Sequence, residues 1–158
     1  MNLFLTDPEN PARIRPPAPP AVFGLPVRTL NIAAHWHSPA TGALLAAEVG
    51  RRPENLHSHV QRISLWHSLG DPVELAAAVL DLWIVLGSFG QDLRLRMLRT
   101  HYDALEQHEM GTYLSSRLHN GIQCHDPCVA LPGVVLARPV EGEREFLRQV
   151  PHSLAIPA

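Results

Sequence analysis

Lysine is absent from this chain of 158 residues, in which all thirteen basic residues are arginine. Together with abundant alanine, leucine and proline, this absence is typical of a GC-rich genome, and we interpret it as compositional bias. The formal net charge is only −2 at pH 7, so the chain has no strong field of either sign. Because nucleic acids and anionic lipid surfaces attract proteins with strong positive fields, we expect neither as a partner.

Cysteine and long apolar runs are also scarce. Two cysteines cannot form the disulfide framework of a small secreted protein, and the first residues lack the basic segment that begins a signal peptide. The most apolar stretch, Pro72 to Leu86, contains Glu74 and Asp81 and is shorter than the roughly 20 apolar residues of a membrane-spanning helix. The sequence therefore predicts a cytoplasmic protein without a membrane segment.

Recognisable catalytic motifs are missing as well. The chain has neither a Gly-x-Ser-x-Gly motif nor a glycine-rich phosphate loop that ends in lysine. Apolar residues make up 46% of the chain and charged residues 18%, a composition typical of a folded domain. These features favour a folded protein that is not an enzyme, although the absence of motifs does not exclude one.

Proline is abundant near the N-terminus. Seven of the fifteen prolines fall between Pro8 and Pro26, and the run Pro16–Pro20 can neither continue a helix nor donate along a sheet. We therefore expect residues 1–37 to form an extended Pro-rich arm. Residues 38–122 are expected to form a helical domain, and residues 123–158 an irregular C-terminal strap packed on it.

Proline also marks the expected helix starts. Ser38-Pro39 predicts a helix from Pro39 to about Val49, because serine caps a helix and proline fits its first position. Arg52-Pro53-Glu54 predicts a second helix with a buried stripe at Leu56, Val60, Ile63, Trp66 and Leu69.

The third helix has the clearest start, at Asp71-Pro72-Val73-Glu74. We expect Asp71 to cap it and Glu74 to reach back to the Asp71 amide, which would complete a capping box. This helix, through Leu86, is apolar on almost every side, and that pattern predicts a central position.

Two further helices are expected after Gly87. Ser88-Phe89-Gly90-Gln91 is typical of a capping box and precedes a stripe of Leu95, Leu98, Tyr102 and Leu105. Arg94, Arg96 and Arg99 fall largely off this stripe, which predicts a solvated basic face. A last helix is expected from about His108 to Asn120.

Turn signals surround the short β-prone run Val134–Leu136, and a short helix is expected at Glu143–Gln149. The predicted fold is mainly α, a compact bundle of about four to five helices in antiparallel hairpins.

Metal binding is one possible use of the histidines and cysteines. The ten histidines are scattered, and we interpret them as surface or boundary groups. Cys124-His125-Asp126-Pro127-Cys128 is more concentrated, with His119 a short distance upstream. Because thiolate and imidazole are common zinc ligands, Cys124, His125, Cys128 and His119 are the candidate site for zinc or iron. The alternative is that the two cysteines are ordinary residues of a turn.

Protein binding is the function that the sequence favours. Helices with short links present grooves to partners, and the helices between Pro53 and Asn120 carry residue types that are enriched at interfaces. The candidate partner-binding residues are Trp66, Trp83, Met97 and Tyr102. We expect a non-catalytic binding module or adaptor that binds another protein or a second copy of itself, with a small metal- or cofactor-binding protein as the alternative.

Overall fold

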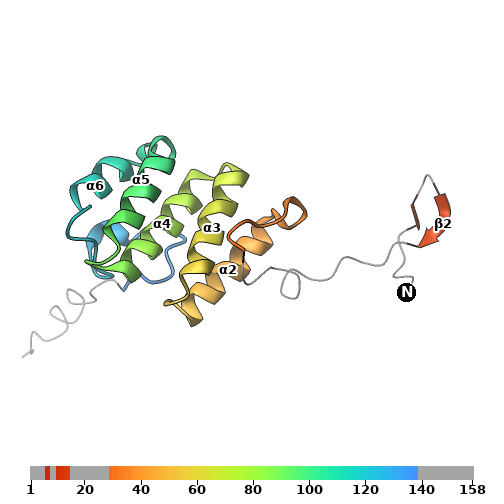
Figure 1. Cartoon of the computed structure of the whole chain (residues 1–158), viewed down its shortest axis with the longest axis horizontal. Helices are drawn as coiled ribbons and strands as arrows, with labels where there is room; N and C mark the ends of the chain where they lie inside the picture. The colour runs from red at the N-terminus through yellow and green to blue at the C-terminus, as the bar shows by residue number, and fades with distance from the viewer. Residues whose placement is uncertain (1–5, 8–9, 15–28, 139–158) are drawn as a thin grey trace, which may run out of the picture.

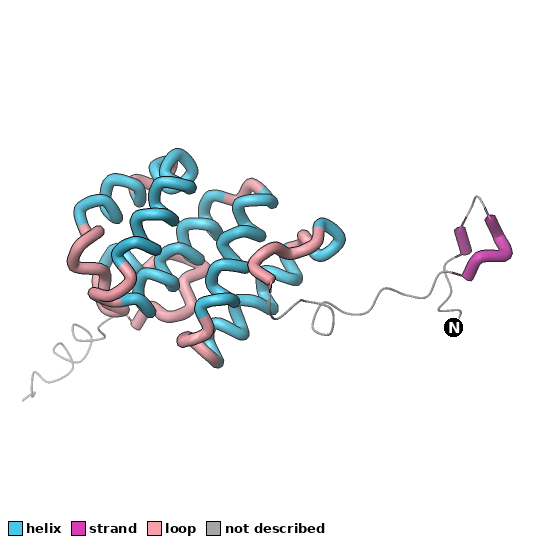
Figure 2. The backbone as a smooth tube through the Cα atoms, viewed as in Figure 1, coloured by secondary structure: helices cyan, strands magenta, loops and turns pink. Residues whose placement is uncertain are grey.

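The computed structural model describes residues 6–7, 10–14 and 29–138. Five α-helices make up most of this described part of the protein. Each helix packs mainly against the next in sequence, so α2 to α6 form a row of antiparallel helices (Figure 1, Figure 2). Their bounds are α2 Pro39–Arg51, α3 Leu56–Leu69, α4 Pro72–Leu86, α5 Gln91–Glu106 and α6 Met110–Ser116. Two 3-10 turns, η1 Ala34–Trp36 and η2 Pro127–Val129, flank the row. The predicted mainly α bundle is confirmed.

A short hairpin lies near the N-terminus. Strands β1 Thr6–Asp7 and β2 Asn10–Ile14 pair antiparallel, with Thr6 opposite Ile14. The sequence did not suggest this hairpin, because Pro11 falls within the second strand. The proline run 16–20 and the predicted helix 143–149 lie outside the described residues.

The capping residues of α2 and α4 act largely as expected. Ser38 Oγ accepts a hydrogen bond from the Thr41 amide at 3.3 Å, and Asp71 Oδ1 accepts from the Val73 and Glu74 amides, both at 3.1 Å. The reciprocal half of the Asp71 capping box was predicted wrongly. The Asp71 amide instead donates to the Trp66 carbonyl at 3.2 Å, which leaves Glu74 free to face Arg62 at 3.9 Å.

Helices α3 and α5 differ from their predicted patterns. Helix α3 begins at Leu56, which is exposed, and its buried face includes four polar residues: Ser58, His59, Gln61 and Arg62. Helix α5 begins after Gly90, without a side-chain cap from Ser88. Its buried residues are Arg94, Leu98, His101 and Leu105, so Tyr102 lies outside the buried face.

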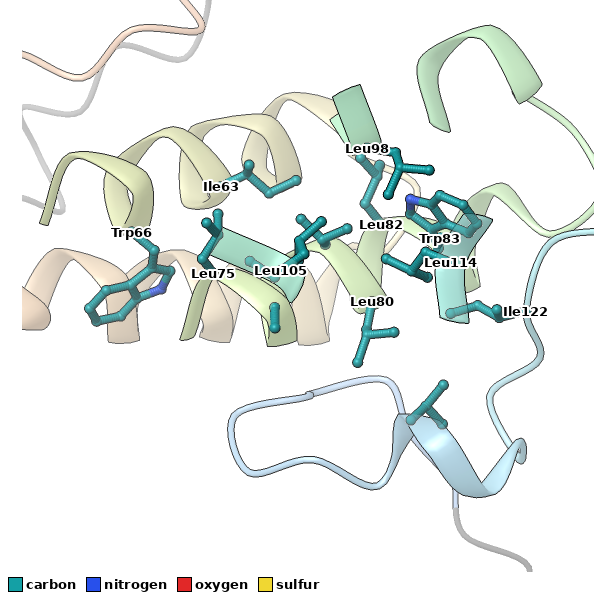
Figure 3. Close-up of a cluster of buried hydrophobic side chains, with 14 residues drawn as sticks. Ile63, Trp66, Leu75, Leu80, Leu82, Trp83, Leu98, Leu105, Leu114 and Ile122 are labelled. Carbon is teal, nitrogen blue, oxygen red and sulfur yellow. The ribbon is translucent and has the colours of Figure 1, made fainter. Parts of the chain in front are cut away.

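Helix α4 forms the centre of the core, as its apolar sequence predicts. Every residue from Leu75 to Trp83 is buried. Trp83 lies beside Leu82, Leu98 and Leu114, which brings α4, α5 and α6 together (Figure 3). No helix of the described residues is both long enough and apolar enough to span a membrane.

The described part of the strap, residues 123–138, packs against these helices. Val129 is buried, and Leu131, Val134 and Ala137 contact the core cluster of α4. The β-prone run Val134–Leu136 forms no strand. Its backbone amides bind Asp81 of α4 instead, so the strap is attached to the bundle by a side chain and not by a sheet.

Candidate functional site

A buried ion pair anchors the strap. Arg62 Nη1 donates to Asp81 Oδ2 at 2.5 Å, and both side chains are almost completely buried. Asp81 also accepts from the amides of Val135 at 3.0 Å and Leu136 at 2.8 Å, while Arg62 Nη2 donates to the Gly133 carbonyl at 2.7 Å. Because both charged groups are engaged with the strap backbone, their role is to position the strap.

Two histidines lie in the interior, which corrects the expectation that all are surface or boundary groups. His59 Nε2 pairs with the Pro53 carbonyl at 2.9 Å, and its Nδ1 is buried without a hydrogen-bond partner. Burial lowers the pKa of His59, against smaller raising contributions from the hydrogen bond to Pro53 and from the charge of Asp81. His101 stacks edge-on against His67 with 4.9 Å between ring centroids. Burial, and to a lesser degree His67, lowers the pKa of His101. Both histidines are therefore neutral at pH 7.

Three of the predicted metal residues, Cys124, His125 and Cys128, lie at the start of the strap, and His119 precedes it. Cys124 is partly buried and Cys128 is exposed, and both are free thiols. His119 and His125 are exposed. Among the residues that the structure describes, no three His, Cys, Asp or Glu side chains gather in a way that could hold a metal ion. The structure therefore does not bring Cys124, His125, Cys128 and His119 together as a ligand set.

The predicted partner-binding residues are mostly part of the core. Trp83 is completely buried and Trp66 nearly so, and Met97 is a partly buried side chain packed against the same core. Only Tyr102 is exposed, at 38%. Of the four predicted residues, Tyr102 alone is therefore exposed at the surface of the bundle.

The loop between α4 and α5 carries a further exposed aromatic residue, Phe89. Its side chain is 82% exposed, more than any other large apolar side chain in the described part of the chain. The loop runs from Gly87 to Gly90, and both glycines have positive φ angles, 54° and 68°. The backbone therefore turns sharply on either side of Phe89 in a conformation that other residues rarely adopt.

Arg94 fixes the conformation of this loop. Its guanidinium is buried and donates to the carbonyls of Gly87, Phe89 (2.8 Å) and Ser88 (3.4 Å). It also donates to Leu118 (3.1 Å) and His119 (3.3 Å), and it lies 5.6 Å from the Trp83 ring centroid. All five N–H donors of the side chain are thus used on backbone carbonyls. Arg94 was wrongly predicted to lie on a solvated basic face, whereas Arg96 and Arg99 are exposed as expected.

The end of the bundle that carries Phe89 also contains an apolar pocket. We call this region, where α2 and α4 end and α3 and α5 begin, the Phe89 end (Figure 1). The pocket has a volume of about 340 Å³ and is lined by Gly50, Pro53, Ile84, Val85, Cys124, Val135, Leu136 and Arg138. Val85 precedes Phe89 by four residues. An exposed aromatic and a mainly apolar pocket therefore lie at the same end of the bundle, where α4 ends.

Other apolar and charged groups extend this surface. Leu56, at the start of α3, and Val135, in the strap, are both exposed. Asp92 and Arg138 are exposed, and neither forms an ion pair within the described ranges. The Phe89 end thus combines an apolar centre with exposed charges of both signs, since Glu54 beside Pro53 is also exposed and forms no ion pair within the described ranges.

Two other pockets are weaker candidates. One of about 480 Å³ lies between α2, α3 and the strap and is lined by Trp66, Arg62 and Glu74 among others. Trp66 Nε1 and Arg62 Nε are unpaired but buried, so a ligand in the pocket does not reach them. A smaller one of about 220 Å³ lies beside His67 and the α3–α4 turn. Neither brings together groups for a reaction.

Comparisons with known proteins add no assignment, since no family model, curated protein or solved structure matches this chain. Sequence reasoning missed Phe89, although one signal was present. An aromatic within Gly87-Ser88-Phe89-Gly90 lies in a turn, where it has little chance of being buried.

Proposed function

We propose that this protein is a non-catalytic protein-binding module, and that the Phe89 end is its contact surface. The observation that carries the proposal is the 82% exposure of Phe89 on a loop whose carbonyls accept three hydrogen bonds from Arg94. Burying a phenylalanine side chain contributes about 1.5–3 kcal/mol. That contribution becomes available only when another surface covers the ring.

The fixed loop makes such a contact more favourable. A flexible loop loses conformational entropy when a partner orders it, whereas a loop already held in one conformation loses little. Aromatic side chains in the centre of an interface commonly contribute most to affinity, and apolar neighbours exclude water around them. Leu56 and Val135 are placed to act as such neighbours.

The proposal includes a cytoplasmic location. It is supported by the two free thiols, Cys124 and Cys128, because a reducing compartment keeps cysteines unpaired. The partner is a protein surface that offers an apolar pocket to the Phe89 ring.

Photo-crosslinking tests this function. A photoreactive phenylalanine analogue is placed at position 89 of the full chain, or at position 73 as a control, and intact cells are irradiated. Val73 is 39% exposed and lies at the opposite end of α4. We expect a discrete protein adduct from position 89 and none from position 73. Equal or absent adduct formation at both positions would contradict the proposal.

A further inference from the structure

We propose that the protein bound at the Phe89 end is a second copy of this chain. Phe89 of each copy then inserts into the other copy's pocket between α2, α4 and the strap. This inference rests on the proposed function and names its partner.

The pocket has the size and lining that a phenyl ring requires. An apolar cavity of about 150 Å³ is large enough to bind benzene, and this pocket has a volume of about 340 Å³. Ile84, Val85, Val135 and Leu136 supply apolar walls. Among the residues that the structure describes, no aromatic side chain lines it.

The positions of ring and pocket suit a two-fold arrangement. In a two-fold dimer, the same surface of both copies must be complementary to itself. Phe89 follows the pocket residue Val85 by four positions, and both lie where α4 ends. In the proposed dimer, a two-fold axis passes between the Phe89 ring and the pocket. The ring of each copy then enters the pocket of the other, so the same contact forms twice.

The charges agree with this arrangement. Arg138 lies at the rim of the pocket, and Asp92 follows Phe89 by three residues in the first turn of α5. Neither has an ion-pair partner among the described residues of its own chain. When Phe89 enters the opposite pocket, Asp92 of one copy approaches Arg138 of the other. Opposite charges at the rim fix the register of an interface more than they add to its affinity.

Sedimentation velocity over a range of concentrations tests for the dimer. We expect the full chain to dimerise reversibly and Phe89→Ala to raise the dimer Kd about 30-fold or more. Val73→Ala is the matched control and is expected to leave the Kd unchanged. Phe89 is so exposed that its replacement has little effect on folding, which circular dichroism verifies.

Arg138→Asp and Asp92→Arg are each expected to weaken the dimer, and the double charge exchange to restore it.

Crosslinking identifies the contact itself. The photoreactive phenylalanine analogue at position 89 keeps the aromatic ring, and the purified full chain that carries it is irradiated as a mixture of isotope-labelled and unlabelled copies. We expect adducts between position 89 of one copy and the pocket residues Val135 and Leu136 of the other, which mass spectrometry identifies. The same analogue at position 73 is expected to give no such adduct.

The results separate this inference from the proposed function. A chain that stays monomeric, or a dimer that Phe89→Ala leaves intact, overturns the inference. If position 89 then photo-crosslinks to a different protein in cells, the binding function stands with another partner. If position 89 gives no adduct at all, both proposals fail.

Discussion

Gly121 lies directly against the carbonyl group of Gly87, so that a Cβ atom at position 121 would be only 1.8 Å from the Gly87 oxygen. The same carbonyl accepts a hydrogen bond from Arg94. The turn after α6 and the loop that presents Phe89 are therefore packed together at one point. This contact links the stability of the bundle to the conformation of its proposed binding surface.

Gly121→Ala tests this close approach. Gly121 has a φ of 73°, and Gly70 has a nearly equal φ of 69° but open space around its Cβ position. Both alanine variants lose about 1–2 kcal/mol from the left-handed backbone. We expect Gly121→Ala to lose at least about 2 kcal/mol more because of the clash. Urea unfolding measures the difference, and equal losses would show that the two loops do not touch.

Arg94→Lys tests the anchoring of the loop. A lysine ammonium has three donors, so it leaves at least two of the five carbonyls without their hydrogen bond. We expect the free energy of unfolding to fall by about 2–4 kcal/mol. The exposed Arg96 provides a matched control, because Arg96→Lys is expected to change stability by less than about 0.5 kcal/mol. Thermal unfolding that is the same for both variants would mean that Arg94 is not buried.

The Arg62–Asp81 pair provides a test of how the strap is held. Asp81→Asn leaves the buried Arg62 charge with only the more distant Glu74 carboxylate, 3.9 Å away, and we expect a loss of about 3–5 kcal/mol. Limited proteolysis is expected to cut within residues 131–138 of this variant before it cuts the helices. The exposed pair Glu48–Arg51, at 3.6 Å, is the control, and Glu48→Gln is expected to cost less than about 1 kcal/mol. A protected strap in Asp81→Asn would contradict this attachment.

Acidification is expected to destabilise the fold through His59 and His101. Burial lowers the pKa of both histidines from the ordinary value of 6.5. As the pH falls below about 6.5, the unfolded chain therefore binds protons that the folded chain does not, and the free energy of unfolding decreases. Above this pH the contribution is fully present. His101→Leu is expected to reduce the slope between pH 6.5 and 5. A slope that His101→Leu does not alter would refute the role of this residue.

The local features of the fold were predictable from the sequence. The starts of α2 and α4 follow from Ser38-Pro39 and Asp71-Pro72, because capping depends only on neighbouring residues. The central position of α4 follows from its continuous apolar sequence.

The candidate site was not predictable in the same way. Two of Arg94's carbonyl acceptors, Leu118 and His119, lie 24 and 25 residues away in sequence. Periodicity places a charged residue on the surface and does not foresee such a set of acceptors. The buried tryptophans illustrate the opposite error, since residue types enriched at interfaces are also common in cores.

Hydroxyl-radical footprinting in intact cells tests most directly whether another protein covers Phe89. The oxidation of Phe89 and Tyr102 is compared between dilute purified protein and cells, with Tyr102 as the internal reference. We predict strong oxidation of Phe89 in dilute solution, marked protection in cells, and equal oxidation of Tyr102 in both. Equal oxidation of Phe89 in cells and in dilute solution would contradict the account, because the ring would then have no partner.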